Sequence, residues 1–161
     1  MNQEQIIIRK AEEADYEAVN HLYHLSYSLY HENMPAVYKK TPATVLKKGD
    51  FLNILQDDRT RMFVAEAEGK VVGHIYAMIE TFDEDEMAPA CERVEVAEIS
   101  IEPAYARMGI GTRLMKEVEK WAKEKKITDL QTLVYDFNKD GIAFYEANGY
   151  KPYSIKIQKK L

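Results

Sequence analysis

The chain has 161 residues, a formal net charge of -5 and a single cysteine, Cys91. This length suits one domain with a real core, and the negative charge argues against general nucleic-acid or membrane-surface binding. A single cysteine excludes an intrachain disulfide, and no stretch approaches the ~20 apolar residues of a membrane helix. The N-terminus also lacks the apolar run of a signal peptide. We therefore expect a cytoplasmic protein with one domain over residues 1–161.

The N-terminal part of the chain predicts one strand followed by one long helix. Ile6–Arg9 is a short apolar run typical of a strand, and Ala11–Tyr30 has apolar residues at helical spacings of three and four positions. Tyr27 and Tyr30 share one face of this helix. They either pack at the core and its rim or form the aromatic wall of a binding pocket, and the sequence leaves both interpretations open.

The next segment, residues 31–49, is predicted to be a loop or a broken helix. Pro35 and Pro42 interrupt helical hydrogen bonding there. Such a loop is either a lid over a binding site or a passive connector. Asp50 then caps a short predicted helix, Phe51–Gln56.

Two strands and an acidic loop follow. Met62–Glu66 and Val71–Glu80 have strand composition, and Glu68-Gly69-Lys70 between them predicts a hairpin turn. The loop over residues 81–93 contains four consecutive acids, which are Asp83, Glu84, Asp85 and Glu86. These acids are either a solvated loop or a negative field that attracts a cationic ligand.

The most informative stretch covers residues 94–115 and predicts a strand, a glycine turn and a helix. β-Branched residues precede Gly109 and Gly111, and apolar residues at helical spacing follow, so that the helix is expected over Gly109–Lys126. The first turn of a helix has free backbone N–H groups at its positive end, and glycines let an anion approach them. The spacing fits neither the dinucleotide fingerprint GxGxxG nor a P-loop, and the two glycines alone also fit close packing of a helix against a strand.

The C-terminal third predicts a strand, a helix and a strand. Leu130–Val134 is the first strand, and a helix begins at Asn138 or Asp140 and ends at Asn148-Gly149. Tyr150–Ile157 is the final predicted strand. This order predicts an α/β fold with a mixed, mostly antiparallel twisted sheet, helices on both faces and a parallel strand pair joined by the helix after the glycine turn.

Three pieces of the chain resemble, in order, the GNAT acetyltransferase superfamily: AEISIEPAYARMGIG, the helix after it, and NKDGIAFYEANGY. The resemblance covers about residues 6–157 and is strongest over residues 98–150. The family signature is Gln/Arg-x-x-Gly-x-Gly/Ala; its Gln/Arg position holds Ala106 here, and the nearest arginine is Arg107. The resemblance implies a GNAT-like acyl-CoA N-acyltransferase fold, in which the two parallel strands splay apart around acetyl-CoA.

The resemblance also assigns the residues that contact CoA. The pantetheine arm is expected to bond the backbone of the strand before the glycine turn, and the pyrophosphate to lie on the amides of that turn. The expected contacts are Ile99, Ser100, Ile101, Ala106, Arg107, Met108, Gly109, Ile110, Gly111, Thr112, Asn138 and Phe144. The N–H of Ile99 is expected to polarise the thioester carbonyl.

The chemistry that the resemblance implies needs a base and an acid but no metal. An alkyl ammonium with a pKa near ~10.4 must lose a proton before it attacks, and Glu98 is the expected base. Strict alternation along the strand places Glu98 on the same face as Val96 and Ser100. Tyr145 matches the tyrosine of the family pattern Asn-x-x-Ala/Gly-x-x-Phe-Tyr that protonates the leaving thiolate. Without the resemblance, Glu98 also fits a solvent-facing acid and Tyr145 a packed helix residue.

We therefore expect acetyl transfer from acetyl-CoA to an amine by direct attack in a ternary complex. The expected acceptor is a small cationic molecule bound by Tyr27, Tyr30, Asp83 and Glu84. The alternatives are a protein N-terminus or lysine as acceptor, and a non-catalytic acyl-CoA-binding sensor. We expect no metal, no nucleic acid and no membrane partner; a homodimer, common in the family, fits the C-terminal strand.

Overall fold

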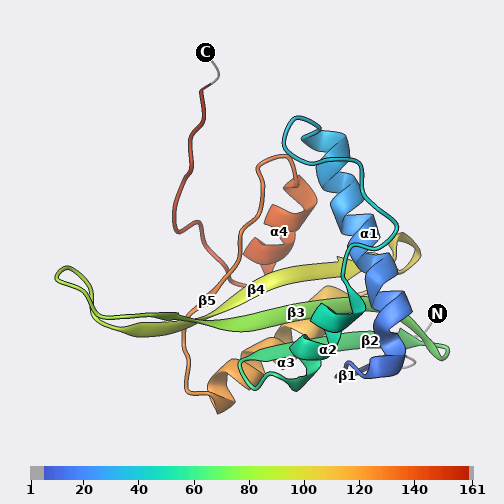
Figure 1. Ribbon diagram of the computed structural model, residues 1–161, viewed down its shortest axis with the longest axis horizontal. Coiled ribbons are helices and arrows are strands. Elements are labelled where there is room, and N and C mark those ends of the chain that lie inside the picture. The colour runs from blue at the N-terminus through green and yellow to red at the C-terminus, as the bar shows by residue number, and fades with distance from the viewer. Residues whose placement is uncertain (1–5, 160–161) are drawn as a thin grey trace.

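The computed structural model describes residues 6–159 and contains a mixed five-stranded sheet with helices on both faces (Figure 1). The strands are β1 (Ile6–Lys10), β2 (Thr60–Ala67), β3 (Lys70–Phe82), β4 (Cys91–Ile101) and β5 (Leu130–Gln131). They lie in chain order across the sheet; the first four pair antiparallel, and β4 pairs parallel with β5. The predicted mixed sheet with one parallel strand pair is therefore confirmed.

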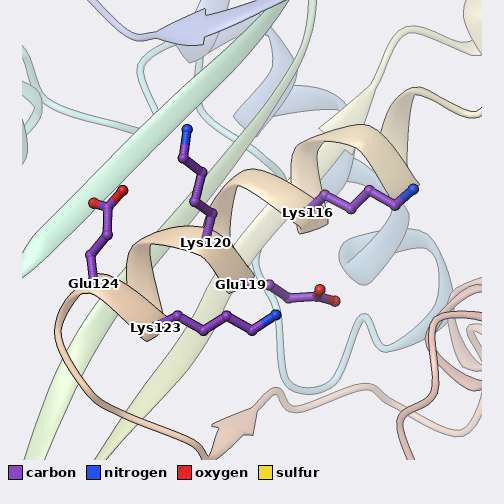
Figure 2. Close-up of a pocket in the computed structure, with 5 residues that line it drawn as sticks. All are labelled: Lys116, Glu119, Lys120, Lys123 and Glu124. Carbon is purple, nitrogen blue, oxygen red and sulfur yellow. The ribbon is translucent and has the colours of Figure 1, made fainter.

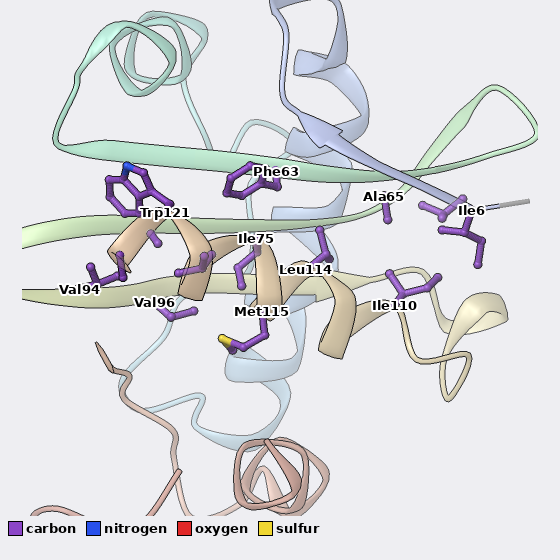
Figure 3. Close-up of a cluster of buried hydrophobic side chains, with 14 of the residues drawn as sticks. Ile6, Phe63, Ala65, Ile75, Val94, Val96, Ile110, Leu114, Met115 and Trp121 are labelled. Carbon is purple, nitrogen blue, oxygen red and sulfur yellow. The ribbon is translucent and has the colours of Figure 1, made fainter. Parts of the chain in front are cut away.

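The described residues form four α-helices around the sheet: α1 (Tyr16–Asn33), α2 (Lys48–Gln56), α3 (Ile110–Glu124) and α4 (Lys139–Ala147). Alternate residues of β2 show the two faces, since Val64 packs in a cluster with α1 and α2 whereas Phe63 packs in the main core with α3. Figure 3 shows Leu114, Met115 and Trp121 of α3 in that main core. None of the helices within residues 6–159 is long and apolar enough to cross a membrane.

The two N-terminal helices begin at other residues than predicted. A 3-10 turn over Glu13–Asp15 precedes α1, and Asp15 accepts hydrogen bonds from Arg9 and from the Glu12 amide. This charged anchor delays the regular helix to Tyr16. The prediction that Asp50 caps the second helix is wrong, because α2 begins at Lys48 and Asp50 lies inside its first turn.

The strands of both hairpins are longer than predicted. Glu68 and Gly69, with φ angles of 51° and 74°, form the tight turn between β2 and β3, which leaves Lys70 in the strand. The loop between β3 and β4 is short because Phe82 pairs with Cys91. This second hairpin projects away from the helices, and its acidic tip lies far from α1 (Figure 1).

A β-bulge in β4 changes which residues share a face. Ala77 pairs with Val96 but Tyr76 pairs with Glu98, so Ala97 is an extra residue on β4. Beyond this bulge the alternation is shifted by one position, and Glu98 lies on the face opposite Val96. The predicted common face of Glu98 and Val96 is therefore wrong, whereas the predicted common face of Glu98 and Ser100 is confirmed by their partners Tyr76 and His74.

The C-terminal part has less strand than predicted. β5 covers only two residues instead of Leu130–Val134, and the predicted strand Tyr150–Ile157 is wrong, because these residues have no strand partner and extend from the body as irregular chain (Figure 1). The predicted end of α4 is confirmed. Gly149 has a φ of +87° and its amide bonds the Glu146 carbonyl, as in a helix C-cap.

Candidate active site

Glu98 is a buried carboxylic acid in the middle of the sheet. Its side chain is 8% exposed and faces α1, where the Ser26 hydroxyl hydrogen-bonds to it; the Ile99 amide is a second donor. Burial raises the pKa of Glu98 to about 7, and the two hydrogen bonds offset only part of that effect. A carboxyl group that titrates near neutral pH is suited to act as a general base.

Four tyrosines surround this carboxyl group. Burial is the main cause of the raised pKa values of Tyr23, Tyr27, Tyr30 and Tyr145, and the negative charge of Glu98 adds to each. All four phenols therefore keep their protons at neutral pH. The structure brings together Glu98, Tyr145, Tyr27 and Tyr30, although these residues come from three different elements.

The Tyr145 hydroxyl group of α4 is placed as a hydrogen-bond donor. The Thr132 hydroxyl donates to the Val96 carbonyl at 2.9 Å, and the Thr132 oxygen lies 3.4 Å from the Tyr145 oxygen. Since a carbonyl can only accept, the single Thr132 proton is used there, and Tyr145 is left as the donor of the pair. A phenol held in this way can protonate a departing group beside it.

An aromatic cluster continues from this site, and three of its members were not predicted. Tyr30 stacks on Tyr38 at 5.3 Å and makes edge contacts with Tyr135 and Phe137 at 5.7 and 6.0 Å. The Tyr38 and Tyr135 hydroxyl groups are 2.7 Å apart, so the loop after α1 is tied to the segment after β5. The loop is thus part of the site wall. Tyr27 joins the cluster through its edge contact with Tyr30 at 5.7 Å.

His74 is a further buried polar residue that sequence reasoning missed. It pairs across the strands with Ser100, stacks on Tyr23 at 4.8 Å, and neither of its ring nitrogens has a hydrogen-bond partner within the described residues. Burial lowers the pKa of His74 to about 3, so the ring is neutral. His74 therefore adds no positive charge that would hold Glu98 ionised at low pH.

The glycine turn has the backbone of an anion-binding loop. Arg107 and Gly109 have φ angles of 62° and 77°, and α3 begins directly after them at Ile110. Alternating left-handed residues before a helix turn successive N–H groups toward one side. The turn therefore offers main-chain donors in addition to the free amides of the first turn of α3.

Gly111 is required by close packing. A Cβ atom there would lie 2.8 Å from the ring of Phe144, and the side chain of Ile101 is also near. Phe144 thus packs α4 against the start of α3. Three of the expected CoA contacts, Ile101, Gly111 and Phe144, are therefore brought together.

The edge of β4 opens next to this turn. β5 pairs with β4 only at Val94 and Glu95, and in the described part of the chain no strand pairs with β4 on that side beyond them. The Ile99 amide already donates to the Glu98 carboxylate, whereas the other main-chain groups of Ile99–Ile101 that face away from β3 have no strand partner and are available to a ligand. These free groups and the glycine turn fit an extended, phosphate-bearing cosubstrate such as acetyl-CoA.

Two expected CoA contacts have partners of their own. Asn138 caps α4, where its side chain accepts a hydrogen bond from the Gly141 amide at 2.9 Å. Arg107 forms a 3.0 Å ion pair with Asp140 in the first turn of α4, and both side chains are exposed. An exposed pair of this kind is weak, so a phosphate can replace Asp140 as the partner of Arg107.

Asp83 and Glu84 are not brought to the site. They follow the end of β3, whereas Glu98 pairs with Tyr76, so the sheet separates them from Glu98 by roughly 20 Å. A surface hollow also lies elsewhere, on the charged outer face of α3 (Figure 2). Its lining residues are Lys116, Glu119, Lys120, Lys123 and Glu124. This hollow contains none of the residues described above and is an open, solvated surface.

Gly111→Ala is expected to destabilise the protein by about 1–3 kcal/mol, because the new methyl group overpacks the contact with Phe144. Urea unfolding measures the effect. Gly49→Ala is the matched control, since nothing lies within 4 Å of a Cβ at that helical position. Adding Phe144→Leu to Gly111→Ala should recover part of the loss. Equal stability of the two alanine variants would contradict the packing contact.

Comparison with known proteins gives one family match. The profile of the acetyltransferase (GNAT) family matches residues 17–150. The chain is also 28% identical over 144 residues to the tRNA(Met) cytidine acetyltransferase TmcA of Aeropyrum pernix. That match covers 80% of this chain but 19% of the other protein, so the chain spans about a fifth of its length.

Solved structures have the same fold as this chain. A mutant of the BH1408 protein from Bacillus halodurans has a TM-score of 0.90 at 18% identity, with 96% of this chain and 99% of that chain covered. The aminoglycoside N-acetyltransferase AAC(6')-Iy in complex with CoA has a TM-score of 0.70 at 19% identity, with 96% and 100% covered. At these identities the likeness shows the fold alone.

Proposed function

The chain belongs to the acetyltransferase (GNAT) family, and we propose that it transfers an acetyl group from acetyl-CoA to the primary amine of a small cationic molecule. The observation that carries this proposal is the buried Glu98, with a pKa of about 7, close to the Tyr145 hydroxyl and beside the open edge of β4. A base, an acid and a row of free main-chain groups are the parts that direct acetyl transfer needs.

Glu98 acts as the base. A primary amine is protonated at neutral pH, and it becomes a nucleophile only after its proton is removed. Near pH 7 about half of the Glu98 carboxyl groups are ionised and can accept that proton, directly or through a water molecule. The Ser26 hydroxyl, which hydrogen-bonds to Glu98, keeps the carboxylate in one orientation.

Tyr145 acts as the acid. Acetyl-CoA supplies an acyl group that is already activated as a thioester, so the protein needs no nucleophile of its own. Burial keeps the Tyr145 hydroxyl protonated, and the Thr132 oxygen is positioned to hold it in place until the sulfur departs. The proton that Tyr145 gives to the sulfur is regained from solvent after release of the products.

The open edge of β4 and the glycine turn hold the cosubstrate. The main chain of Ile99–Ile101 would bond the pantetheine arm, and the amides of residues 107–112 would bond the pyrophosphate. Ala106 provides no side-chain donor at the position where the family has Gln or Arg. The exposed Arg107 guanidinium can supply one instead.

The aromatic cluster supports a small cationic acceptor. Tyr27, Tyr30 and Tyr38 offer ring faces and edges around Glu98, and an ammonium group is attracted to such faces. The hydrogen bond between Tyr38 and Tyr135 closes this side of the site, which suits a small molecule better than an extended polypeptide. We therefore place a protein N-terminus or lysine second.

A tRNA acceptor has little support, although the relative from Aeropyrum pernix is a tRNA(Met) cytidine acetyltransferase. This chain spans 19% of that protein. Its formal net charge of -5 also disfavours binding to a polyanion.

The test is thiol release from acetyl-CoA with a panel of amines, which contains polyamines, aminoglycosides and short peptides. We expect turnover of at least one small polycationic amine. Turnover of peptides alone would contradict the small-molecule acceptor. Binding of acetyl-CoA without thiol release in the presence of any of these amines would favour the non-catalytic sensor instead.

Asp83→Asn combined with Glu84→Gln is expected to change kcat/KM for such an amine by less than about twofold. The two acids lie roughly 20 Å from Glu98, beyond the distance at which exposed charges act at physiological salt. The measurement is initial rates at subsaturating amine. A large fall that high salt abolishes would instead support electrostatic attraction of the acceptor by the hairpin tip.

A further inference from the structure

The segment after β5 stays close to β4 without pairing with it as a strand. β5 ends at Gln131, which pairs with Glu95, and residues 132–135 form neither helix nor strand. In a regular parallel ladder, further main-chain bonds to β4 would hold such a segment. The segment nevertheless places the Thr132 oxygen 3.4 Å from the Tyr145 hydroxyl, so contacts other than main-chain pairing must keep it in position.

Two side-chain hydrogen bonds take the place of that ladder. The Thr132 hydroxyl donates to the Val96 carbonyl at 2.9 Å. The Leu133 amide donates to the side chain of Glu95. Main-chain pairing holds two strands ~4.8 Å apart, whereas a bond through a glutamate side chain lets the second chain diverge. Glu95 therefore connects the two chains at the point where β5 leaves β4.

Glu95 shares a face of the sheet with Glu98. Glu95 pairs with Met78 and Glu98 pairs with Tyr76, and these two β3 residues are two positions apart. Two positions along a strand span about 7 Å, so the two acids are neighbours on one face. Burial is the main cause of the raised pKa of Tyr145, and the charges of both acids add to it. Glu95 is therefore close to the proposed acid.

The chain that Glu95 holds also leads into the aromatic wall of the site. Tyr135 and Phe137 stack on each other at 5.9 Å, and both make edge contacts with Tyr30 of α1. Because Leu133 lies only two residues before Tyr135, a shift of the Leu133 contact would move this wall as well as the group beside the proposed acid.

We propose that Glu95 is a positioning residue: by accepting the Leu133 hydrogen bond, it holds the segment after β5 where Thr132 orients the proposed acid. Glu95 acts on the reaction through Tyr145, so the inference rests on the proposed function. Its role needs a hydrogen-bond acceptor and no negative charge. Burial and the charge of Glu80 raise the pKa of Glu95, and the Leu133 amide lowers it. A neutral acceptor of the same length should therefore replace it.

The kinetic test compares Glu95→Ala with Glu95→Gln, by thiol release from acetyl-CoA with an amine that wild type turns over. The alanine variant loses the acceptor, and its kcat should fall by ~10-fold or more. Glutamine keeps an oxygen that can accept the Leu133 hydrogen bond, so its kcat should lie within about threefold of wild type. Glu80→Ala is the control, because it removes a neighbouring acid without removing this bond, and its kcat should equal that of wild type.

The affinity for acetyl-CoA separates positioning from a general loss of structure. The groups proposed to bind acetyl-CoA lie on Ile99–Ile101 and in the glycine turn, so Glu95→Ala should bind it with a dissociation constant within about threefold of wild type. A variant that had lost its structure would lose binding together with kcat.

Amide hydrogen exchange tests the contact without any acetyl transfer. We expect the Leu133 amide to exchange ~10-fold faster or more in Glu95→Ala, and near the wild-type rate in Glu95→Gln. A wild type that released no thiol with any amine would contradict the proposed function alone, since the exchange rates would still show whether Glu95 holds the segment. The inference would be overturned by a glutamine variant as slow as the alanine variant, by an alanine variant as fast as wild type, or by Leu133 exchange that is equal in all three proteins.

Discussion

Tyr145→Phe is expected to lower kcat by ~10²–10⁴-fold, the usual effect of removing a general acid. The substitution keeps the ring and its contacts with Phe144 and Tyr150, so only the proton donor is lost. Steady-state thiol release gives kcat, and calorimetric titration of the same variant with acetyl-CoA should give a dissociation constant within about threefold of wild type.

Tyr150→Phe is the matched control for this substitution. Tyr150 is also a partly buried tyrosine on the same ring cluster, but its hydroxyl bonds the sulfur of Met115 and not a group of the site. Its turnover should remain near that of wild type. If Tyr145→Phe turned over at the rate of Tyr150→Phe, the role of Tyr145 as the acid would be wrong.

Glu98→Gln is the second substitution with a large expected effect. An amide cannot accept the ammonium proton, so kcat/KM should fall by ~10²–10⁴-fold at its optimum. In wild type kcat/KM should rise with pH through an apparent pKa of about 7, because burial raises the pKa of Glu98 to that value and only the ionised form is active. The residual activity of the variant should lack this rise. If kcat/KM of Glu98→Gln rose with pH as in wild type, the rise would come from the ionisation of another group.

The same burial makes Glu98 a cost to stability. The folded-state pKa of about 7 lies above the ordinary value of 4.5, so the folded protein holds the proton more tightly and loses stability as pH rises from 4.5 to 7. The full loss above pH 7 is roughly 3 kcal/mol. Glu98→Gln should therefore unfold at higher urea than wild type at pH 8 and near the wild-type value at pH 4. If Glu98→Gln were less stable than wild type at pH 8, the claim that the buried Glu98 charge destabilises the fold would be wrong.

Local patterns in the sequence are sufficient to predict most of the elements. Residue type and spacing alone predict a strand before Gly109, a turn at Gly109 and a helix after it. The structure confirms that the strands before and after this helix are parallel. The pairing of Glu98 with Tyr145 depended on the family resemblance. No local rule relates a residue of β4 to a residue of α4, which lie far apart in the sequence and interact through the tertiary fold.

The face of Glu98 could not be predicted, because a bulge leaves no local signature in a run of strand residues. Alternation assigned Glu98 to the side of Val96, but the extra residue Ala97 turned it toward α1. Ser26 did leave a signal. It is a hydroxyl residue within the apolar stripe of α1, between Tyr23 and Tyr30, and such a residue usually has a polar partner across the interface.

The remaining differences arise from contacts distant in sequence. Tyr38 lies in a proline-containing loop and Tyr135 after a strand, and nothing in either segment indicates that their hydroxyl groups meet. The predicted strand Tyr150–Ile157 shows the reverse case. Its alternating pattern is typical of a strand, but the prediction is wrong, because a strand needs a neighbouring strand and none pairs with these residues within the described part of the chain.

The most direct test of the account is amide NMR of the folded protein titrated with acetyl-CoA. The account predicts saturable shifts of the main-chain amides of residues 99–101 on β4 and 107–112 in the glycine turn, with further shifts at Thr132 and Tyr145. A titration that leaves these amides unchanged, or that shifts only residues elsewhere on the molecule, would contradict the assignment of the acetyl-CoA site.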